Sequence, residues 1–275
     1  MPGKTTIIKT GICSYGMSGK LFHAPFIEHH PGFELTAIVE RSKNESREKY
    51  PGARLYRSVE EMISDDSIAL IIVNTPVQTH YDYAVKAITA GKHVIVEKPF
   101  TVTSAEAEEL VALADSKNVL LAVYQNRRYD GDYHAVREVL QQGWLGDIKE
   151  VEIRFDRYRP GISTKLHKES DLPGAGTMYD LGAHLIDQAL QLFGEPVSLF
   201  ADLAAMRDGS PVDDYFEIIL FYSSYRVRLK GSSFVKEPVP EYILNGSRGT
   251  FLQKRSDLQE VNLLKGVIPS LDTWW

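Results

Sequence analysis

In the first half of this 275-residue chain, short apolar runs alternate with segments of helical character. Residues 68–74 form an unbroken run, Ile-Ala-Leu-Ile-Ile-Val-Asn, as expected for a central parallel strand that is buried on both faces. The strand-like runs are residues 7–13, 34–39, 53–56, 68–74, 92–97 and 119–125. Because strands that alternate with helices form parallel sheets, this half predicts an α/β fold with a doubly wound parallel sheet.

The pattern changes in the second half. Residues 147–158 alternate in part with a period of two, which is typical of a half-exposed strand. An irregular stretch at 159–176 precedes a predicted helix at 177–193, and four more strand-like segments follow. The dipeptide Asn245-Gly246 predicts a hairpin turn between two of them. We therefore expect a second domain of the α+β class with a mainly antiparallel open sheet.

Composition and charge argue against several classes of function. The net charge of −6 and the pI near 5.8 argue against a nucleic-acid or anionic-membrane partner. The sequence has no apolar stretch of the ~20 residues that a bilayer span needs and no apolar signal-peptide segment near its start, so we expect a cytoplasmic location. The single cysteine, Cys13, cannot form an intramolecular disulfide, and its place at the end of a strand-like run favours a buried core position.

Residues 14–19, Ser-Tyr-Gly-Met-Ser-Gly, follow the first strand-like run and nearly match the dinucleotide-binding pattern G-x-G-x-x-G. Gly16 and Gly19 occupy the second and third glycine positions, whereas Ser14 replaces the glycine of the tight turn. Glu40 ends the next strand, where an acidic side chain would bind the adenosine ribose. We interpret the turn as a nucleotide site; the alternative is an ordinary strand–helix turn. The candidate cofactor ligands here are Ser14, Tyr15, Gly16, Met17, Gly19, Glu40 and Arg41.

Two further segments follow central strands at the carboxyl edge, where open α/β sheets bind their ligands. Thr75, Pro76 and His80 belong to the first segment. Glu97 and Lys98 belong to the second, and we expect all five residues to line the cofactor site. The ammonium group of Lys98 can hydrogen-bond a substrate hydroxyl and stabilise its deprotonated form. The alternatives are a helix start that contains a proline and an ordinary loop lysine.

Asp180 and His184 are four residues apart, so a helix would place them on one face, with Asp187 adjoining it. His184 can then take a proton from a substrate while Asp180 tunes or relays it. The spacing lacks an HExxH pattern and any supporting cysteine, and we expect no metal. The alternative is a polar helix face with a histidine that serves only the structure.

Polar residues near the junction of the two halves are candidates for substrate contact. Asn126 and Arg127 follow the sixth strand-like run. Arg127 and Arg128 can either orient a polar substrate or form ion pairs between the domains, and we expect at least one of the two to be structural. Arg159 and His167 are further candidates, because the loop at 161–173 is expected to select the substrate.

Three segments carry a family resemblance: GKHVIVEKPFTVT, YQNRRYDGDY and GAGTMYDLGAHLIDQALQLFG. In this order they resemble the Gfo/Idh/MocA family, the glucose–fructose oxidoreductase and inositol dehydrogenase group, and the resemblance runs from about Ile7 to Phe251. GMSGKLFHAPF and FDRYRP are similar to its scyllo-inositol-dehydrogenase-like branch. The resemblance implies an NAD(P)-binding Rossmann domain at 1–125 and a substrate and oligomerisation domain at 126–275. It also implies a homodimer or homotetramer formed through the C-terminal sheet.

The resemblance further implies hydride transfer between a nicotinamide cofactor and a sugar, inositol or related polyol. Lys98 matches the lysine that contacts substrate and nicotinamide, and His184 matches the acid/base that is paired with Asp180. Glu40 favours NAD, because it would bond the ribose 2′-hydroxyl and repel a 2′-phosphate. Arg41 and the two residues after it keep NADP open, since they can receive that phosphate if Glu40 turns away.

Two other functions remain open from the sequence. One is a catalytically silent NAD(P)-binding sensor or assembly protein. The other is a sugar-modifying enzyme that oxidises its substrate transiently and keeps the cofactor bound. Members of the family usually continue for several tens of residues beyond the segment that matches, so we expect this chain to be a shortened protein or part of a longer one.

Overall fold

The structure is a computed structural model that describes residues 6–164 and 166–270. The chain divides into two compact units. The first extends through Tyr124 and also takes in the segment that begins at Gln259, and the second is Gln125–Leu258. The division falls beside the expected boundary after residue 125, and the C-terminal segment is grouped with the first unit rather than with the second.

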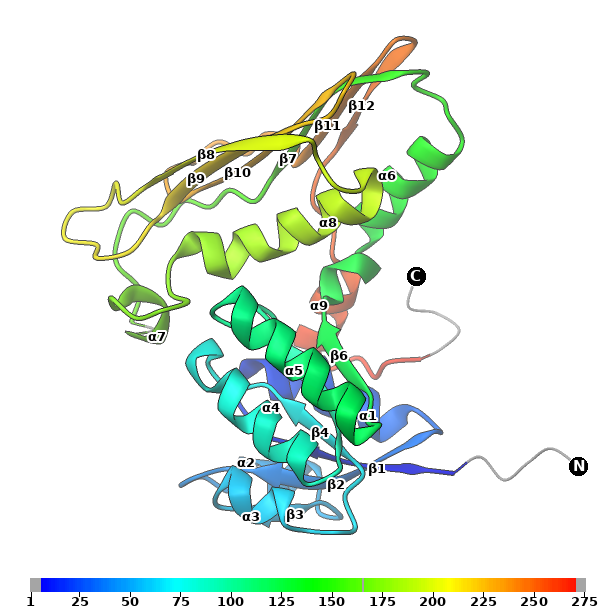
Figure 1. Ribbon diagram of the computed structural model, residues 1–275, viewed down its shortest axis with the longest axis vertical. Coiled ribbons are helices and arrows are strands. Elements are labelled where there is room, and N and C mark those ends of the chain that lie inside the picture. The colour runs from blue at the N-terminus through cyan, green and yellow to red at the C-terminus, as the bar shows by residue number, and fades with distance from the viewer. Residues whose placement is uncertain (1–5, 165, 271–275) are drawn as a thin grey trace, which may run out of the picture. The chain divides into compact units, whose positions relative to one another are not determined.

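The first unit is built on a six-stranded sheet in the order β3-β2-β1-β4-β5-β6 (Figure 1). All of its pairings are parallel, which confirms the predicted doubly wound sheet. The strand order reverses between β1 and β4, so the carboxyl ends of these two strands flank the crevice where such sheets bind ligands. The strands are β1 (Ile8–Ile12), β2 (Phe33–Val39), β3 (Arg54–Tyr56), β4 (Leu70–Val73), β5 (His93–Glu97) and β6 (Leu121–Tyr124).

Burial explains the unbroken apolar sequence of β4. Ile71 and Val73 pack into one core cluster, whereas Ile72 packs into another on the opposite face of the sheet. A strand that is covered on both faces has no position for a polar side chain, so its sequence does not alternate. Cys13 is buried in the same core as Ile71, as predicted, and this burial raises the pKa of its thiol.

Local capping signals set several helix starts in the first unit. Ser58 accepts a hydrogen bond from Glu61 N (3.2 Å), and Thr103 and Glu106 form a reciprocal capping box. Pro76 does not open an α-helix directly, because Thr79 N bonds the Pro76 carbonyl and a 3-10 turn comes first. The helices are η1 (Gly19–His23), α1 (Ala24–His29), α2 (Glu45–Lys49), α3 (Val59–Ile63), η2 (Val77–Thr79), α4 (His80–Thr89), α5 (Ser104–Lys117) and α9 (Leu258–Leu264).

The second unit contains a six-stranded sheet in the order β12-β11-β7-β10-β9-β8. β7 and β10 pair in parallel and the other neighbours are antiparallel, which confirms the mainly antiparallel sheet. The strands are β7 (Ile148–Arg154), β8 (Ser198–Ala204), β9 (Tyr215–Phe221), β10 (Arg226–Ser232), β11 (Tyr242–Gly246) and β12 (Gly249–Gln253). The helices are η3 (Asn126–Tyr129), α6 (Gly131–Gln141), α7 (Leu166–Glu169), η4 (Met178–Gly182) and α8 (Ala183–Phe193).

Helix α8 covers one face of this sheet (Figure 1). Leu185 and Ala189 are fully buried against strand residues such as Val151 and Leu229. Alternate residues of β7, β9 and β10 are buried on this face, and the others point away from it. The helix thus fixes which side of the sheet is core and which remains open.

Two expectations for the second unit need correction. The predicted continuous helix at 177–193 begins as the π-helix η4 and becomes α-helical only at Ala183. Asn245-Gly246 is not the hairpin turn: both residues belong to β11, and the turn is at 247–248. Gly246 is needed for close packing instead, because a Cβ there would lie 2.2 Å from the Leu145 carbonyl oxygen.

None of the helices within 6–164 and 166–270 combines the length and the hydropathy that crossing a bilayer requires.

Candidate functional site

The turn after β1 does not require a glycine at its first position. Among the described residues Asn118 is the only non-glycine with a positive φ, so Ser14 has ordinary backbone geometry. Its hydroxyl accepts a hydrogen bond from Gly16 N (3.3 Å). Gly19 is the sterically restricted position, because a Cβ there would lie 2.2 Å from the Ser14 carbonyl oxygen. The serine is therefore compatible with a tight turn, and Gly19 supplies the close contact between turn and helix.

Asn74, the residue after β4, ties this turn to the neighbouring strand. Its Nδ2 donates to the Ser14 carbonyl (2.8 Å) and to Ser18 Oγ (3.3 Å). Its Oδ1 is buried and, within the described part of the chain, has no hydrogen-bond partner. An unsatisfied buried acceptor in the crevice, next to an open Gly16 and a helix N-terminus, fits a ligand that carries both hydroxyl and phosphate groups. These residues therefore fit a dinucleotide.

Other residues predicted to bind the cofactor take different positions. The Tyr15 side chain is buried against Tyr50, with ring centroids 6.1 Å apart, and burial is the main cause of its raised pKa. Only its backbone can therefore contribute to a cofactor site, whereas the Met17 side chain is exposed. The buried Glu40 carboxylate, expected on the ribose, instead accepts from the backbone amides of Glu45 (3.1 Å) and Ser46 (3.0 Å) at the start of α2.

The loops after β4 and β5 are held together by a buried histidine. His80 Nε2 lies 2.8 Å from the Thr75 carbonyl oxygen, and its Nδ1 lies 2.9 Å from that of Pro99. Burial is the largest influence on His80 and lowers its pKa. His80 therefore fixes the backbone of the loops after β4 and β5 to each other. Pro76, between Thr75 and η2, is exposed.

Lys98 directly follows β5, and its backbone is anchored by Glu97. One oxygen of the Glu97 carboxylate accepts from Lys98 N (3.2 Å), and the other accepts from His23 Nε2 (2.8 Å). His23 is buried and its ring lies 4.4 Å from the ring of Tyr124. The helix that starts at the cofactor turn is thereby linked to the backbone of Lys98. No spacing pattern in the sequence predicts the contact between His23 and Glu97, which are 74 residues apart.

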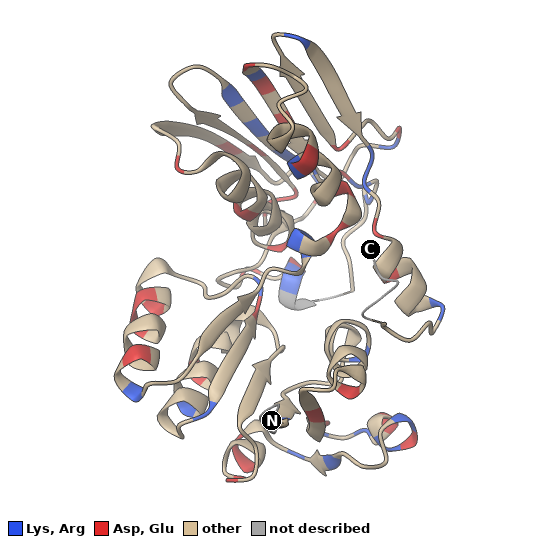
Figure 2. Ribbon diagram, turned by 90° about the vertical axis from the view of Figure 1, so that its right-hand side faces the viewer, with Lys and Arg blue, Asp and Glu red and all other residues tan. Residues whose placement is uncertain are grey.

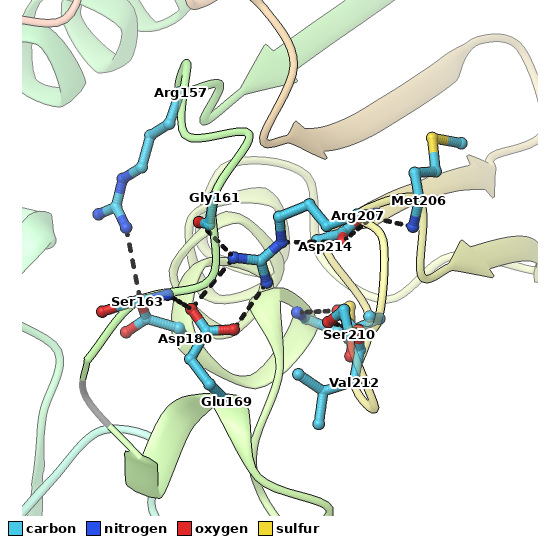
Figure 3. A network of polar contacts seen from close by, with 12 residues as sticks. Arg157, Gly161, Ser163, Glu169, Asp180, Met206, Arg207, Ser210, Val212 and Asp214 are labelled. Atoms are coloured by element: carbon cyan, nitrogen blue, oxygen red, sulfur yellow. Dashed lines mark hydrogen bonds and ion pairs between the residues drawn. The ribbon is translucent and has the colours of Figure 1, made fainter.

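In the second unit, Asp180 lies in a cluster of charged side chains. Lys168 Nζ donates to Asp180 Oδ1 at 2.5 Å. Figure 3 shows Arg157 directed toward the Asp180 carboxylate, with its Nη1 3.5 Å from Oδ2. The Arg157 guanidinium also stacks over Phe155, whose ring centroid is 6.4 Å from that of the buried His184. Burial is the main influence on Arg157 and lowers its pKa, although Asp180 opposes this. Lys168 and Arg157 were not among the predicted site residues.

The remaining candidates are the residues that were expected to contact the substrate, and some of them form ion pairs within the second unit. Arg128 forms an ion pair with Asp187 within the second unit and not between the domains. Arg127 bonds Asp130 (2.8 Å) and lies over Phe155, on the same ring as Arg157. Asn126 is half-buried at the start of η3, and Arg159 is exposed. The side chain of His167 lies outside the described residues. Among the residues that the structure describes, no three His, Cys, Asp or Glu side chains are grouped to hold a metal.

Comparison with known proteins matches both units. Residues 8–125 match the family described as "Oxidoreductase family, NAD-binding Rossmann fold", and residues 133–252 match the "GFO/IDH/MocA C-terminal domain". A scyllo-inositol 2-dehydrogenase (NADP(+)) of Bacillus subtilis is 38% identical over 271 residues, which are 98% of this chain and 75% of the relative. A trans-1,2-dihydrobenzene-1,2-diol dehydrogenase of Xenopus laevis is 28% identical over 249 residues, with 88% and 73% covered. The crystal structure of an oxidoreductase from Bacteroides fragilis matches with a TM-score of 0.87 at 48% identity, over 98% of this chain and 77% of that one.

Replacing Gly19 with alanine is expected to distort the turn, because the new Cβ would collide with the Ser14 carbonyl. Overpacking of this kind costs about 1–3 kcal/mol, so urea unfolding without cofactor should show a lower free energy of unfolding. Gly16→Ala is the matched control, since its Cβ would meet Ser14 Oγ at an ordinary 3.5 Å. This control should keep its stability but bind NADP+ more weakly, because it obstructs the approach of the phosphates. Equal stability of the two variants would contradict the role of Gly19.

Proposed function

The chain belongs to the Gfo/Idh/MocA family of NAD(P)-dependent oxidoreductases, and from that premise we propose that it oxidises a hydroxyl group of an inositol, a sugar or a related polyol. It is a dehydrogenase that acts on CH–OH groups. The substrate proposal rests on three residues: Lys98, which follows β5, Asp180 in η4 and His184 in α8. Relatives named as inositol and dihydrodiol dehydrogenases support a substrate that bears neighbouring hydroxyl groups.

Each of the three residues has a distinct chemical task. A bound nicotinamide supplies the hydride acceptor. His184 removes the proton of the substrate hydroxyl, and Asp180 holds the His184 imidazole in its productive orientation. Lys98 hydrogen-bonds the same oxygen and stabilises the negative charge that develops there. The Glu97 contact to Lys98 N supports this role, because it fixes the backbone from which the ammonium group extends.

Lys98→Ala and His184→Ala are each expected to lower kcat by about 10²-fold or more while cofactor affinity changes little. Turnover would be measured as NAD(P)H formation with scyllo-inositol, myo-inositol and glucose. Lys117→Ala and His29→Ala, both on the exposed surface, serve as matched controls. Near-normal turnover in both site variants would overturn the assignment, and no net NAD(P)H formation by the unaltered protein would favour the silent or transient-oxidation alternatives.

We propose that NADP is the preferred cofactor, which reverses the preference for NAD drawn from Glu40. The Glu40 carboxylate accepts hydrogen bonds from the backbone amides at the start of α2 and from Ser46 Oγ (2.5 Å). Arg57 holds the following loop by donating to the carbonyl oxygens of Glu40 (2.9 Å) and Lys43 (2.7 Å). Arg41 is exposed in that loop and can pair with a 2′-phosphate. The Bacillus relative, whose name specifies NADP(+), supports this preference.

Arg41→Ala should weaken NADP+ binding by about 10-fold, the loss of one charge-assisted contact, and leave NAD+ binding nearly unchanged. Isothermal titration of both cofactors measures this difference directly. Lys49→Ala on the exposed side of α2 is the control, because it removes one positive charge from the same region. Tighter binding of NAD+ than of NADP+ by the unaltered protein would refute the proposal.

We further propose that the open face of the second sheet forms a homo-oligomer contact. One row across the strands consists of Phe200, Ile219, Arg228, Glu152, Ile243 and Leu252. Phe200 is 56% exposed and Leu252 is 57% exposed, while Arg228 pairs with Glu152 and Glu217 between them. Figure 2 shows basic and acidic residues on neighbouring strands of this sheet. A surface with apolar side chains at both ends and paired opposite charges between them suits self-association about a twofold axis.

Phe200→Asp is expected to shift the protein toward the monomer, because it would place a carboxylate in the apolar part of the contact. Light scattering after gel filtration measures the mass. Val111→Asp on α5 is the matched control, since Val111 is similarly exposed at 51% but lies in the first unit. A monomeric unaltered protein, or an unchanged oligomer in Phe200→Asp, would argue against the proposal.

A further inference from the structure

A buried arginine lies at the centre of a polar network near Asp180 (Figure 3). The Arg207 side chain is 6% exposed, and its Nε donates to Asp214 Oδ2 at 2.9 Å. Its Nη1 and Nη2 donate to the two oxygens of Glu169 at 3.1 and 2.8 Å. The Asp214 side chain is fully buried and also accepts from the backbone amides of Met206 and Arg207. A two-pronged arginine–carboxylate contact of this kind fixes both distance and direction.

This network holds the short helix α7 in place. Glu169 is the last residue of α7, so the arginine contact acts directly on that helix. The same carboxylate accepts from Ser163 N at 3.2 Å, and Arg207 Nη1 also donates to the Gly161 carbonyl at 3.3 Å. Both ends of the segment from Gly161 to Glu169 are therefore tied to one guanidinium group.

Lys168 precedes Glu169 in α7 and connects the polar network to Asp180 through a hydrogen bond. Its Nζ donates to Asp180 Oδ1 at 2.5 Å, although its side chain is 39% exposed. A lysine–carboxylate pair at such exposure is weak by itself, because ordering two flexible side chains offsets the attraction. Fixing the helix on which Lys168 lies removes part of that entropic loss. The clamp on Glu169 thus explains how a half-exposed lysine stays on Asp180.

The connection between β8 and β9 also supports Asp180, the acceptor in the contact with Lys168. The Asp213 carboxylate accepts from Met178 N at 2.6 Å, and the Asp213 carbonyl accepts from Thr177 N at 2.9 Å. Gly176 has a φ of +94°, and a Cβ there would lie 2.1 Å from Asp213 Oδ1. Asp213 therefore fixes the start of η4, which carries Asp180, while its neighbour Asp214 fixes Arg207.

We propose that Arg207 is a positioning residue for the reaction: by clamping Glu169 it holds Lys168 on Asp180, and so sets the orientation and the charge balance of the Asp180–His184 pair. This inference rests on the acid/base role of His184 in the proposed function. The charged groups in contact with Asp180 include Lys168 from α7 and Arg157 after β7. His184 lies four residues further along the chain. Without Lys168, the less compensated carboxylate favours the imidazolium form of His184, so the base form needs a higher pH.

The test compares Lys168→Met with Lys168→Arg. In Lys168→Met, the NMR titration midpoint of the His184 ring should rise by about half a pH unit or more. The resonance is assigned by its absence in His184→Ala. The acidic limb of kcat/KM for the best polyol of the panel should move in the same direction, with a fall of about 3-fold or more near neutral pH. Lys168→Arg keeps the charge and should keep both profiles. So should Lys149→Met, an exposed lysine of the same unit.

Arg207→Lys keeps the charge but loses the two-pronged contact, and it should reproduce the shift seen in Lys168→Met. Combining the two substitutions should add little, because both act through the same contact. Glu169→Gln tests the same clamp where Arg207→Lys fails to fold, as judged by thermal unfolding. His184 titration unchanged in Lys168→Met and in the clamp variants, with His184→Ala inactive, would overturn this inference alone. Retained turnover in His184→Ala would overturn the proposed function and this inference with it.

Discussion

Parallel pairing in the first sheet brings the carboxyl ends of all six strands to one edge. The loops after β1, β4 and β5 therefore gather there, and buried polar contacts fix them to one another. The Asn74 amide holds the turn after β1, and His80 bridges the loops after β4 and β5. The geometry of this edge thus depends on side chains that cross between loops, and an unusual glycine conformation in the turn is not required. That is why a serine at the first fingerprint position is compatible with the fold.

The sequence was sufficient for the architecture because the dominant signal is local. The unbroken apolar run of β4 and the strand–helix alternation predicted the parallel sheet, and partial alternation predicted the half-exposed sheet. Features that depend on contacts distant in sequence could not be predicted. The parallel pairing of β7 with β10 joins strands separated by three helices and two strands. The place of Gly246 within β11 reflects close packing against Leu145, which no turn propensity records.

The residues of the candidate site also differ in whether local sequence patterns could predict them. Lys98 follows a predicted strand, and Asp180 and His184 lie in a predicted helix, so sequence patterns could single them out as candidates for the proposed reaction. The use of Glu40 as a cap for α2 could not be foreseen, because an acid at the end of β2 is equally suited to a ribose and to the start of a helix. Lys168 and Arg207 carry no pattern of their own. Arg207 meets Glu169 across 38 residues, and only the folded chain brings them together.

The helix after the cofactor turn and the helix that carries Asp180 both begin with π-helical segments, η1 and η4. This geometry accounts for the contact that Asp180 receives from Lys168, outside its own helix. A π-helix bonds residues five apart, is rare, and is frequently found at functional sites. Asp180 lies in the wider turn of η4, and the regular α-helix begins only after it, at Ala183. Gly182 ends η4, and a Cβ there would lie 2.6 Å from Sδ of Met178 at the start of the same segment. Helix α8 can therefore position His184 through its buried face, but a carboxylate on the widened turn needs an external partner. The clamp that runs from Arg207 through α7 to Lys168 provides that partner from outside the helix.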